Sequence, residues 1–327
     1  MYTKMDNSGV EDVCYEKEHI EKVMEVIRNN FDQYFMRFLD STAGRGLSLE
    51  EIQRLQNKFK IGGQSNKKNK DLSENFKAII CEAIDDFEKD RGDYEKIFRK
   101  EWLEDLDDDA YSFKSKTLKN ECPIIRKTLA NKKAKELDKY RISFSMADAE
   151  QLLNVVYNLC VFGDEHQKQY DPDTYEDAQT YRDLDFALLD TDEYTAFGVI
   201  GGGIKSHMLY KVHPAIFPNR SRSAIWALWY LTGQKTFGCR TDSEFLMIDR
   251  DKTITQQNYF YPYQLFAYYA FEIYKMLRDK AKDYNVYIDT DYRYVIVDAF
   301  LEYVAMEHYE DISFFKKQLK DGVRGDA

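Results

Sequence analysis

FGVIGGGIKSHMLYKVHPAIFPNRSRSAIWALWYL, residues 197–231, is the stretch from which the rest of the chain is best interpreted. Its three consecutive glycines, Gly201 to Gly203, lie between two apolar segments. Residues 197–200 precede them, and the apolar residues that follow recur at helical spacing. The pattern predicts a helix, a tight glycine turn and a second helix. Because glycine has no Cβ atom, a phosphate can approach the N–H groups that begin the second helix. The turn is therefore a candidate clamp for a DNA backbone.

The composition is that of an acidic, folded protein. The 327 residues carry a net charge of −11, and 43% of them are hydrophobic, with 25 Tyr and 21 Phe. This length accommodates one or two domains with sizeable cores. No apolar run reaches membrane-spanning length, and the N-terminus has neither a signal peptide nor a presequence pattern. We expect a cytoplasmic protein with no membrane partner.

Apolar residues recur at helical spacing along most of the chain, which indicates a mainly α, multi-helix protein. The expected fold contains a helix-hairpin-helix element and at most a minor β component, for which residues 245–248 are the best strand candidate. We expect an N-terminal helical region at residues 1–144 and a C-terminal helical region with the glycine hairpin at residues 145–327. One continuous domain is the alternative. The clearest amphipathic patterns lie at residues 18–39, 73–89, 145–160, 265–280 and 292–309.

Charge is segregated along the sequence. Acidic residues are concentrated at 104–109 and 164–193, and a stretch rich in lysine and arginine, 126–141, lies between them. A protein that binds DNA strongly and non-specifically usually has a basic surface. This chain as a whole is acidic. The segregation still allows a local basic face.

The cysteines do not form a recognisable motif. They are odd in number and scattered, with no C-x-x-C pair and no matching histidine cluster. Buried thiols are favoured over a disulfide framework or a zinc site, and we expect no metal and no cofactor. The five are Cys14, Cys81, Cys122, Cys160 and Cys239.

The segment GGGIKS, with Gly201, Gly203, Lys205 and Ser206, resembles the G-x-G-x-K-[ST] hairpin of the helix-hairpin-helix DNA glycosylases. The resemblance covers roughly 35 residues. In that family the lysine at this position is the amine nucleophile of bifunctional members. An aspartate follows the next helix, in a loop that often contains proline, and Asn219 stands where that aspartate is expected. An amide cannot supply the negative charge.

The resemblance implies an enzyme that binds double-stranded DNA, flips a damaged or modified base out of the stack and hydrolyses its N-glycosidic bond. DNA repair or anti-phage defence is the expected context, and a lyase step stays open. Asp242, Asp249 and Glu193 are the carboxylates that can replace the missing aspartate. The predicted catalytic residues are Lys205, Asn219, Asp242 and Asp249; the DNA-contacting residues are Gly201, Gly203, Ser206, Arg220 and Arg222; the base-pocket residues are Tyr259, Tyr261 and Tyr263.

Two other functions are compatible with the sequence. One is a non-catalytic nucleic-acid-binding module that keeps the hairpin. The other is an acidic helical protein that binds or inhibits a basic protein partner, in which the glycines only turn the chain. The acidity of the chain favours the second of these, and the local residue pattern favours DNA.

Overall fold

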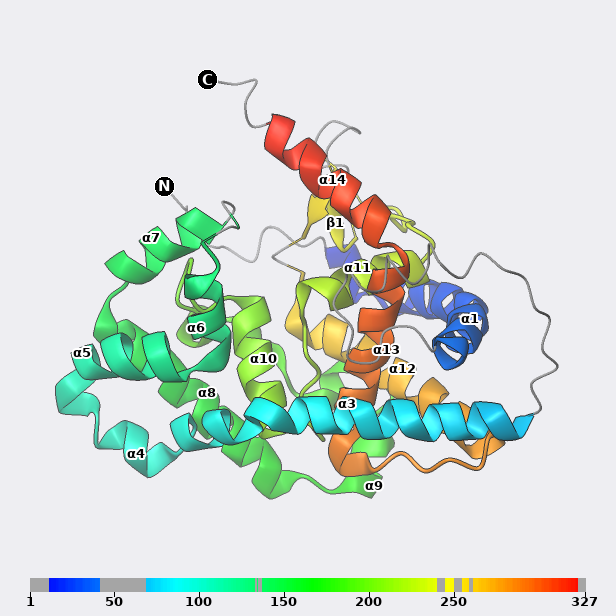
Figure 1. Ribbon diagram of the computed structural model, residues 1–327, viewed down its shortest axis with the longest axis horizontal. Coiled ribbons are helices and arrows are strands. Elements are labelled where there is room, and N and C mark those ends of the chain that lie inside the picture. The colour runs from blue at the N-terminus through cyan, green and yellow to red at the C-terminus, as the bar shows by residue number, and fades with distance from the viewer. Residues whose placement is uncertain are drawn as a thin grey trace.

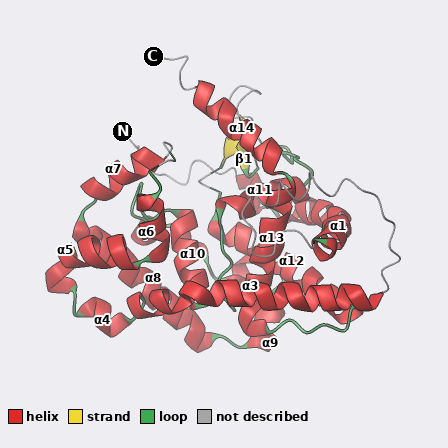
Figure 2. Ribbon diagram, viewed as in Figure 1, coloured by secondary structure: helices red, strands yellow, loops and turns green. Residues whose placement is uncertain are grey.

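The computed structural model describes residues 12–41, 69–132, 134, 137–239, 245–249, 255–258 and 261–322. Nearly all the regular structure in these ranges is helical, which confirms the mainly α prediction (Figures 1 and 2). The minor β component is a hairpin of β1 (Met247–Asp249) and β2 (Thr255–Gln257), which pair antiparallel with Ile248 opposite Gln256. No described helix combines the length and apolarity that crossing a membrane requires.

The described part of the chain contains both long and short helices. In chain order they are η1 (Asp12–Tyr15), α1 (Lys17–Asp40), α3 (Asn69–Ile97), α4 (Lys100–Glu104), η2 (Asp107–Asp109), α5 (Ala110–Ser112), η3 (Phe113–Glu121), α6 (Pro123–Ala130), α7 (Asp138–Met146), α8 (Ala149–Gln169), α9 (Pro172–Glu176), η5 (Tyr181–Leu184), η6 (Ala187–Asp190), η7 (Asp192–Tyr194), α10 (Gly202–Val212), α11 (Arg222–Leu231), α12 (Tyr263–Asp283), η8 (Thr290–Tyr292), α13 (Arg293–Glu307) and α14 (Tyr309–Gly322).

Helix α13 is the central element of the larger part of the fold. It packs against α11, α12, α3 and α1, and it lies behind the long helix α3 in Figure 1. Its sequence, RYVIVDAFLEYVAME, is apolar on nearly every side, as expected for a helix surrounded by others. Asp298 and Glu302 lie inside this run, one helical turn apart, and a third acidic residue, Glu307, ends it.

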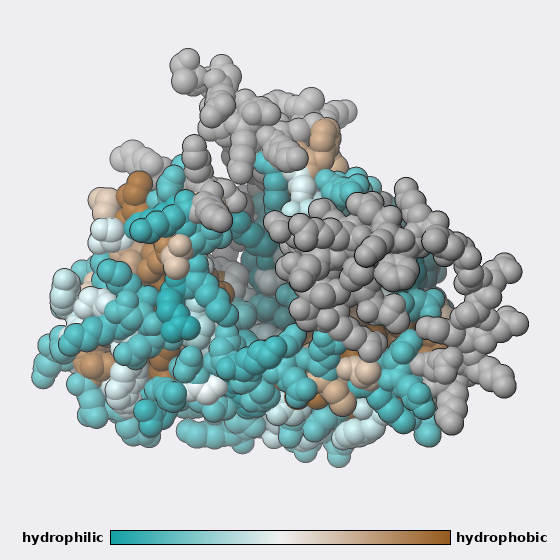
Figure 3. All heavy atoms as spheres, viewed as in Figure 1, coloured by the Kyte–Doolittle hydropathy of each residue, from teal (hydrophilic) through white to brown (hydrophobic). Residues whose placement is uncertain are grey.

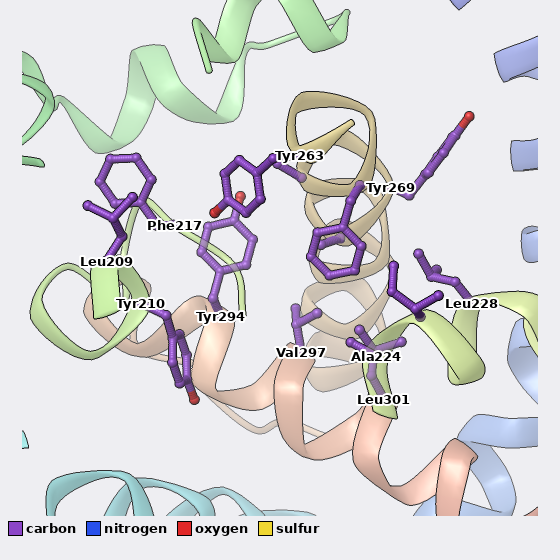
Figure 4. Close-up of a cluster of buried hydrophobic side chains, with 14 of the residues drawn as sticks. Leu209, Tyr210, Phe217, Ala224, Leu228, Tyr263, Tyr269, Tyr294, Val297 and Leu301 are labelled. Atoms are coloured by element: carbon purple, nitrogen blue, oxygen red, sulfur yellow. The ribbon is translucent and has the colours of Figure 1, made fainter. Parts of the chain in front are cut away.

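The apolar core is continuous across the two regions predicted from the sequence. Rings from α1 meet rings from α13: the centroids of Phe31 and Phe300 are 5.3 Å apart. Figure 4 shows the part of the core where α10, α11, α12 and α13 meet, with Tyr263 and Tyr294 side by side. Residues before and after position 144 therefore contribute to the same buried cluster.

The packing of α11 on α13 makes a prediction about stability. Leu301 is buried at this interface, so Leu301→Ala leaves a cavity and should lower the free energy of unfolding by about 2–5 kcal/mol. Urea unfolding measures the change. The matched control is Leu188→Ala in η6, where the side chain is 54% exposed and the expected change is within about 0.5 kcal/mol. Equal effects at the two leucines would contradict the central position of α13.

Candidate functional site

The glycine segment starts α10 as the sequence predicts, but the chain before it is not the expected helix. Ala196 and Ile200 pair through an isolated antiparallel bridge, and Gly198 between them has φ +76°. This conformation costs glycine little and other residues more, and it closes a tight loop in place of a helical turn. Gly201 is then the N-cap residue of α10.

Arg220 covers the start of α10. A Cβ atom on Gly202 would lie 2.7 Å from a guanidinium nitrogen of Arg220, so glycine is needed for this close approach. The guanidinium is buried and donates to the carbonyl oxygen of Asn258 at 3.1 Å, while the Arg220 backbone N–H donates to Ser206 Oγ at 3.1 Å. Arg220 and Ser206, two of the residues predicted to contact DNA, therefore form hydrogen bonds within the protein.

The remaining predicted DNA contacts are distributed differently. Gly201 faces open space, whereas a Cβ on Gly203 would lie 3.6 Å from the Arg220 carbonyl oxygen. Arg222 begins α11 and is exposed. Gly201 and Gly203 are both partly exposed, so these two glycines and Arg222 are the members of the predicted set that solvent reaches.

Lys205 is enclosed in the protein rather than placed at a cavity. Its ammonium group donates to the backbone carbonyl of Leu189 and, at 3.0 Å, to Thr195 Oγ1. Burial lowers the pKa of Lys205 to about 8, and the nearby Asp190 opposes the shift. The lowered pKa is what an amine nucleophile needs. The amine is, however, already hydrogen-bonded, and its two bonds connect α10 to the segment 187–195.

The predicted base-pocket tyrosines that the structure describes lie in the core. Tyr261 is buried, and its ring packs edge-on against Phe245 with centroids 5.4 Å apart. Tyr263 is also buried and donates its hydroxyl to the Pro218 carbonyl at 2.9 Å. Tyr259 and Asp242 lie outside the described residues.

Two of the candidate replacement acids have described backbones. Asp249 ends β1 opposite Thr255, and Glu193 lies in η7, where its carbonyl accepts from Asn158 Nδ2 at 3.0 Å. Glu193 is not one of the residues that line the cavity described next, and the side chain of Asp249 lies outside the described part of the chain.

Asn219 lies at a cavity of about 580 Å³ between α3, α6, α10 and α13, closed at one side by the end of α1. Figure 3 shows this face hollowed above α3, beside α6. We call it the acidic cavity because its carboxylates outnumber its cations. The polar lining used below consists of Asp86, Asp90, Lys127, His207, Tyr210, Lys211, Asn219, Asp298 and Glu302.

A carboxylate that the sequence analysis missed lies next to Asn219. The Asn219 amide donates to both oxygens of Asp298, at 3.2 and 3.1 Å. The Tyr210 hydroxyl also hydrogen bonds to Asp298, and Figure 4 shows the Tyr210 side chain directed away from the core cluster toward α3. Asp298 is thus held by two donors. Asn219, at the position where the resemblance predicts an aspartate, therefore lies beside a carboxyl group, that of Asp298.

Asp298 and Glu302 form a pair of carboxyl groups that hold protons unusually well. Burial raises the pKa of Asp298 well above its ordinary value, and the nearby Glu302 raises it further. Glu302 is exposed within the cavity, yet the surrounding protein removes enough water to raise its pKa, and Asp86 adds to the shift. Like charges in one site favour a state in which the pair keeps a proton.

The opposite wall of the cavity is ionised. Lys211 donates to Asp90 at 2.7 Å and to the Phe87 carbonyl at 2.7 Å, and Lys127 contacts the other Asp90 oxygen at 3.0 Å. Burial alone would raise the pKa of Asp90, but the hydrogen bonds from the two lysines lower it below its usual range. Burial and the neighbouring Lys211 lower the pKa of His207 to about 4, so this imidazole is neutral at physiological pH.

The two walls offer acid–base chemistry rather than a shared metal. Among the described residues, no three carboxylate or imidazole groups of the cavity bring ligand atoms to one point. A protonated carboxyl group can donate a proton, and an ionised one can accept a proton or stabilise a positive charge. The sequence signal for this pair was two acids, four residues apart, inside an apolar helical run.

No protein-family model matches the chain, and no match is found among curated proteins or solved structures. The chemistry of the acidic cavity is consequently the basis on which a function is inferred.

The raised pKa of Glu302 makes a prediction about pH and stability. The folded protein binds more protons at this site than the unfolded chain, so wild type should lose stability as pH rises above the ordinary glutamate pKa. Glu302→Gln removes this loss, and its unfolding free energy relative to wild type should increase with pH. Urea unfolding from pH 4 to 9 measures the difference, and Glu310→Gln, at an exposed position of α14, is the matched control. A difference independent of pH would contradict the shift.

Proposed function

We propose that the protein hydrolyses an N-glycosidic bond in the acidic cavity and releases a base, with Asp298 and Glu302 as its acid–base pair. The observation that carries the proposal is the location of these two carboxyl groups. They share one turn of α13, both open to the same cavity, and both have a raised pKa. Raised carboxyl pKa values in a cavity are typical of general acids.

The bond to be broken needs both forms of a carboxyl group. As the bond between C1′ and the base nitrogen breaks, its electron pair goes to the base, which takes a proton from the protonated carboxyl group. The sugar carbon becomes positively charged, and the ionised carboxylate stabilises it. Water then bonds to C1′ and gives its proton to the carboxylate. A pair that shares one proton supplies these two functions within one site.

Asn219 and Tyr210 position the pair. The amide donates to both Asp298 oxygens, and the phenol hydrogen bonds to the same carboxyl group. These contacts leave Glu302 as the acid more accessible from the cavity. Asn219 therefore has a role that an amide can perform, although the sequence predicted a charge at its position.

The size and walls of the cavity suit a nucleoside unit. A volume of about 580 Å³ is within the usual range for small-molecule sites. The rings of Phe87, Tyr94 and Tyr303 line it, and aromatic faces can stack a flipped base.

Double-stranded DNA is the substrate class that we propose, with a damaged or modified base and a role in repair or defence against phage. The acidic interior disfavours phosphate, so only the base and its sugar would enter. Lys127 at the cavity and Arg126 on the same helix are both exposed cations that can bind the flanking phosphates. Arg222 on α11 offers a further cation.

Base release tests the proposal directly. Wild-type protein is incubated with duplexes that carry normal, damaged or hypermodified bases, and with free nucleosides, and released bases are identified by mass spectrometry. We expect release by wild type and a loss of about 10²- to 10⁴-fold in Glu302→Gln and Asp298→Asn, because general acid–base catalysis contributes this much. Glu310→Gln is the matched carboxylate control.

Lys205→Met separates this mechanism from a lysine nucleophile. We expect the folded variant to release the base, since the Lys205 ammonium group is enclosed and hydrogen-bonded to Leu189 and Thr195. Loss of release in Lys205→Met with full release in Glu302→Gln would assign the chemistry to Lys205. DNA binding without release would leave a non-catalytic module, and neither activity would leave the acidic interaction protein.

Tyr210→Phe tests the positioning role through the pH profile. The hydrogen bond from Tyr210 lowers the pKa of Asp298, so its removal should raise that pKa further. The alkaline limb of base release should move to higher pH, because the pair keeps its proton longer. A variant with reduced release and an unmoved pH profile would show that Tyr210 has only a packing role.

A further inference from the structure

Two cysteines and a histidine from distant parts of the sequence meet outside the acidic cavity. The sulfur atoms of Cys14 and Cys239 are 3.6 Å apart, although the residues are separated by 225 positions. His19 brings a ring nitrogen to the same place, and the three ligand atoms all lie within 4.8 Å of one another. Within the described residues this is the one group of three or more potential metal ligands that converge.

The separation of the two sulfur atoms fits a tetrahedral zinc site. With zinc–sulfur bonds of about 2.3 Å and a tetrahedral angle, two thiolates lie about 3.8 Å apart, and a thiolate and an imidazole nitrogen about 3.6 Å. The observed sulfur separation differs from the first value by only a few tenths of an ångström. A disulfide requires about 2.05 Å, so the two sulfurs are not bonded to each other.

The three side chains are fixed by the local backbone. Cys14 lies in η1 and His19 in the first turn of α1, so one short segment supplies two ligands. Cys239 follows two residues with positive φ, Phe237 at 54° and Gly238 at 82°, and its N–H donates to the Thr236 carbonyl at 3.1 Å. After this turn, the Cys239 side chain lies beside Cys14 and His19.

The surroundings suit a neutral metal complex. Cys14, His19 and Cys239 are 2%, 4% and 9% exposed. The His19 ring packs edge-on against Phe237 and Phe245, with centroids 5.9 and 5.6 Å away. Zn²⁺ with two thiolates and one neutral imidazole has no net charge, so burying it among aromatic rings costs far less than burying an isolated ion.

We propose that Cys14, His19 and Cys239 bind a structural Zn²⁺ ion, with a fourth ligand, water or a further protein group, completing the tetrahedron. Binding converts two thiols to thiolates and releases two protons. The metal would fasten the N-terminal segment to the turn after α11. This differs from the expectation of no metal, because the sequence offered no short motif. The proposal is independent of the hydrolysis that we propose for the acidic cavity.

Metal content of the full-length protein tests this proposal. The wild type, Cys239→Ser, His19→Gln and Cys160→Ser are purified without chelators and analysed for zinc by inductively coupled plasma mass spectrometry. We expect one zinc per chain in wild type and in Cys160→Ser, whose changed cysteine is buried in α8 outside the cluster. Cys239→Ser and His19→Gln should contain almost none.

Cobalt substitution guards against variants that fail to fold. Metal-free wild type titrated with Co²⁺ should develop the thiolate charge-transfer band and the intense visible absorption of a tetrahedral site, and Cys160→Ser should do the same. The proposal is overturned if wild type takes up neither zinc nor cobalt. It is also overturned if intact mass shows a Cys14–Cys239 disulfide, which lacks two hydrogens, or if Cys160→Ser loses the metal as Cys239→Ser does.

Discussion

Burial of α13 is the constraint on which the rest of the structure depends. A helix that is apolar on nearly every side must be covered by neighbours, and α1, α3, α11 and α12 provide that cover. Asp298 and Glu302 cannot avoid this environment, because they occupy the same helix. They can be accommodated only where the cover is incomplete, and the acidic cavity between α3, α6 and α10 is that place. Packing and chemistry are thus linked through one helix.

The polar groups around the cavity divide into two sets with different protonation. Lys211 and Lys127 keep Asp90 ionised through direct contacts, so that wall behaves as a fixed ion pair. On the α13 wall, the described hydrogen-bond donors to Asp298 are Asn219 and Tyr210, and both are neutral. Neutral donors orient a carboxyl group without forcing it to ionise, which is the property that proton transfer requires.

The sequence predicted the class of fold and the start of α10 well, because helical periodicity and glycine punctuation are local signals. It placed the site less well. Asn219 does line the cavity, but its carboxylate neighbour Asp298 is 79 residues away, and no local pattern pairs the two. Lys205 lies in a segment that resembles one with a lysine nucleophile. In the structure, its ammonium group instead donates hydrogen bonds to Leu189 and Thr195.

Cys14 and Cys239 illustrate the same limit more strongly, since only the folded chain brings their sulfur atoms to 3.6 Å. Spacing along the sequence reveals a metal site when its ligands come from one or two short motifs. Here the turn at Phe237 and Gly238 supplies the second half of the site, and its conformation is a tertiary feature.

We infer that α13 presents to the cavity a pair of carboxyl groups that keep a proton. The most direct measurement is a ¹³C NMR titration of the side-chain carboxyl groups in the full-length protein, assigned by comparison with Asp298→Asn and Glu302→Gln. We expect two carboxyl resonances that titrate above the ordinary aspartate and glutamate range, and a change in one of them when the other residue is substituted. Two resonances that titrate independently at ordinary values would contradict it.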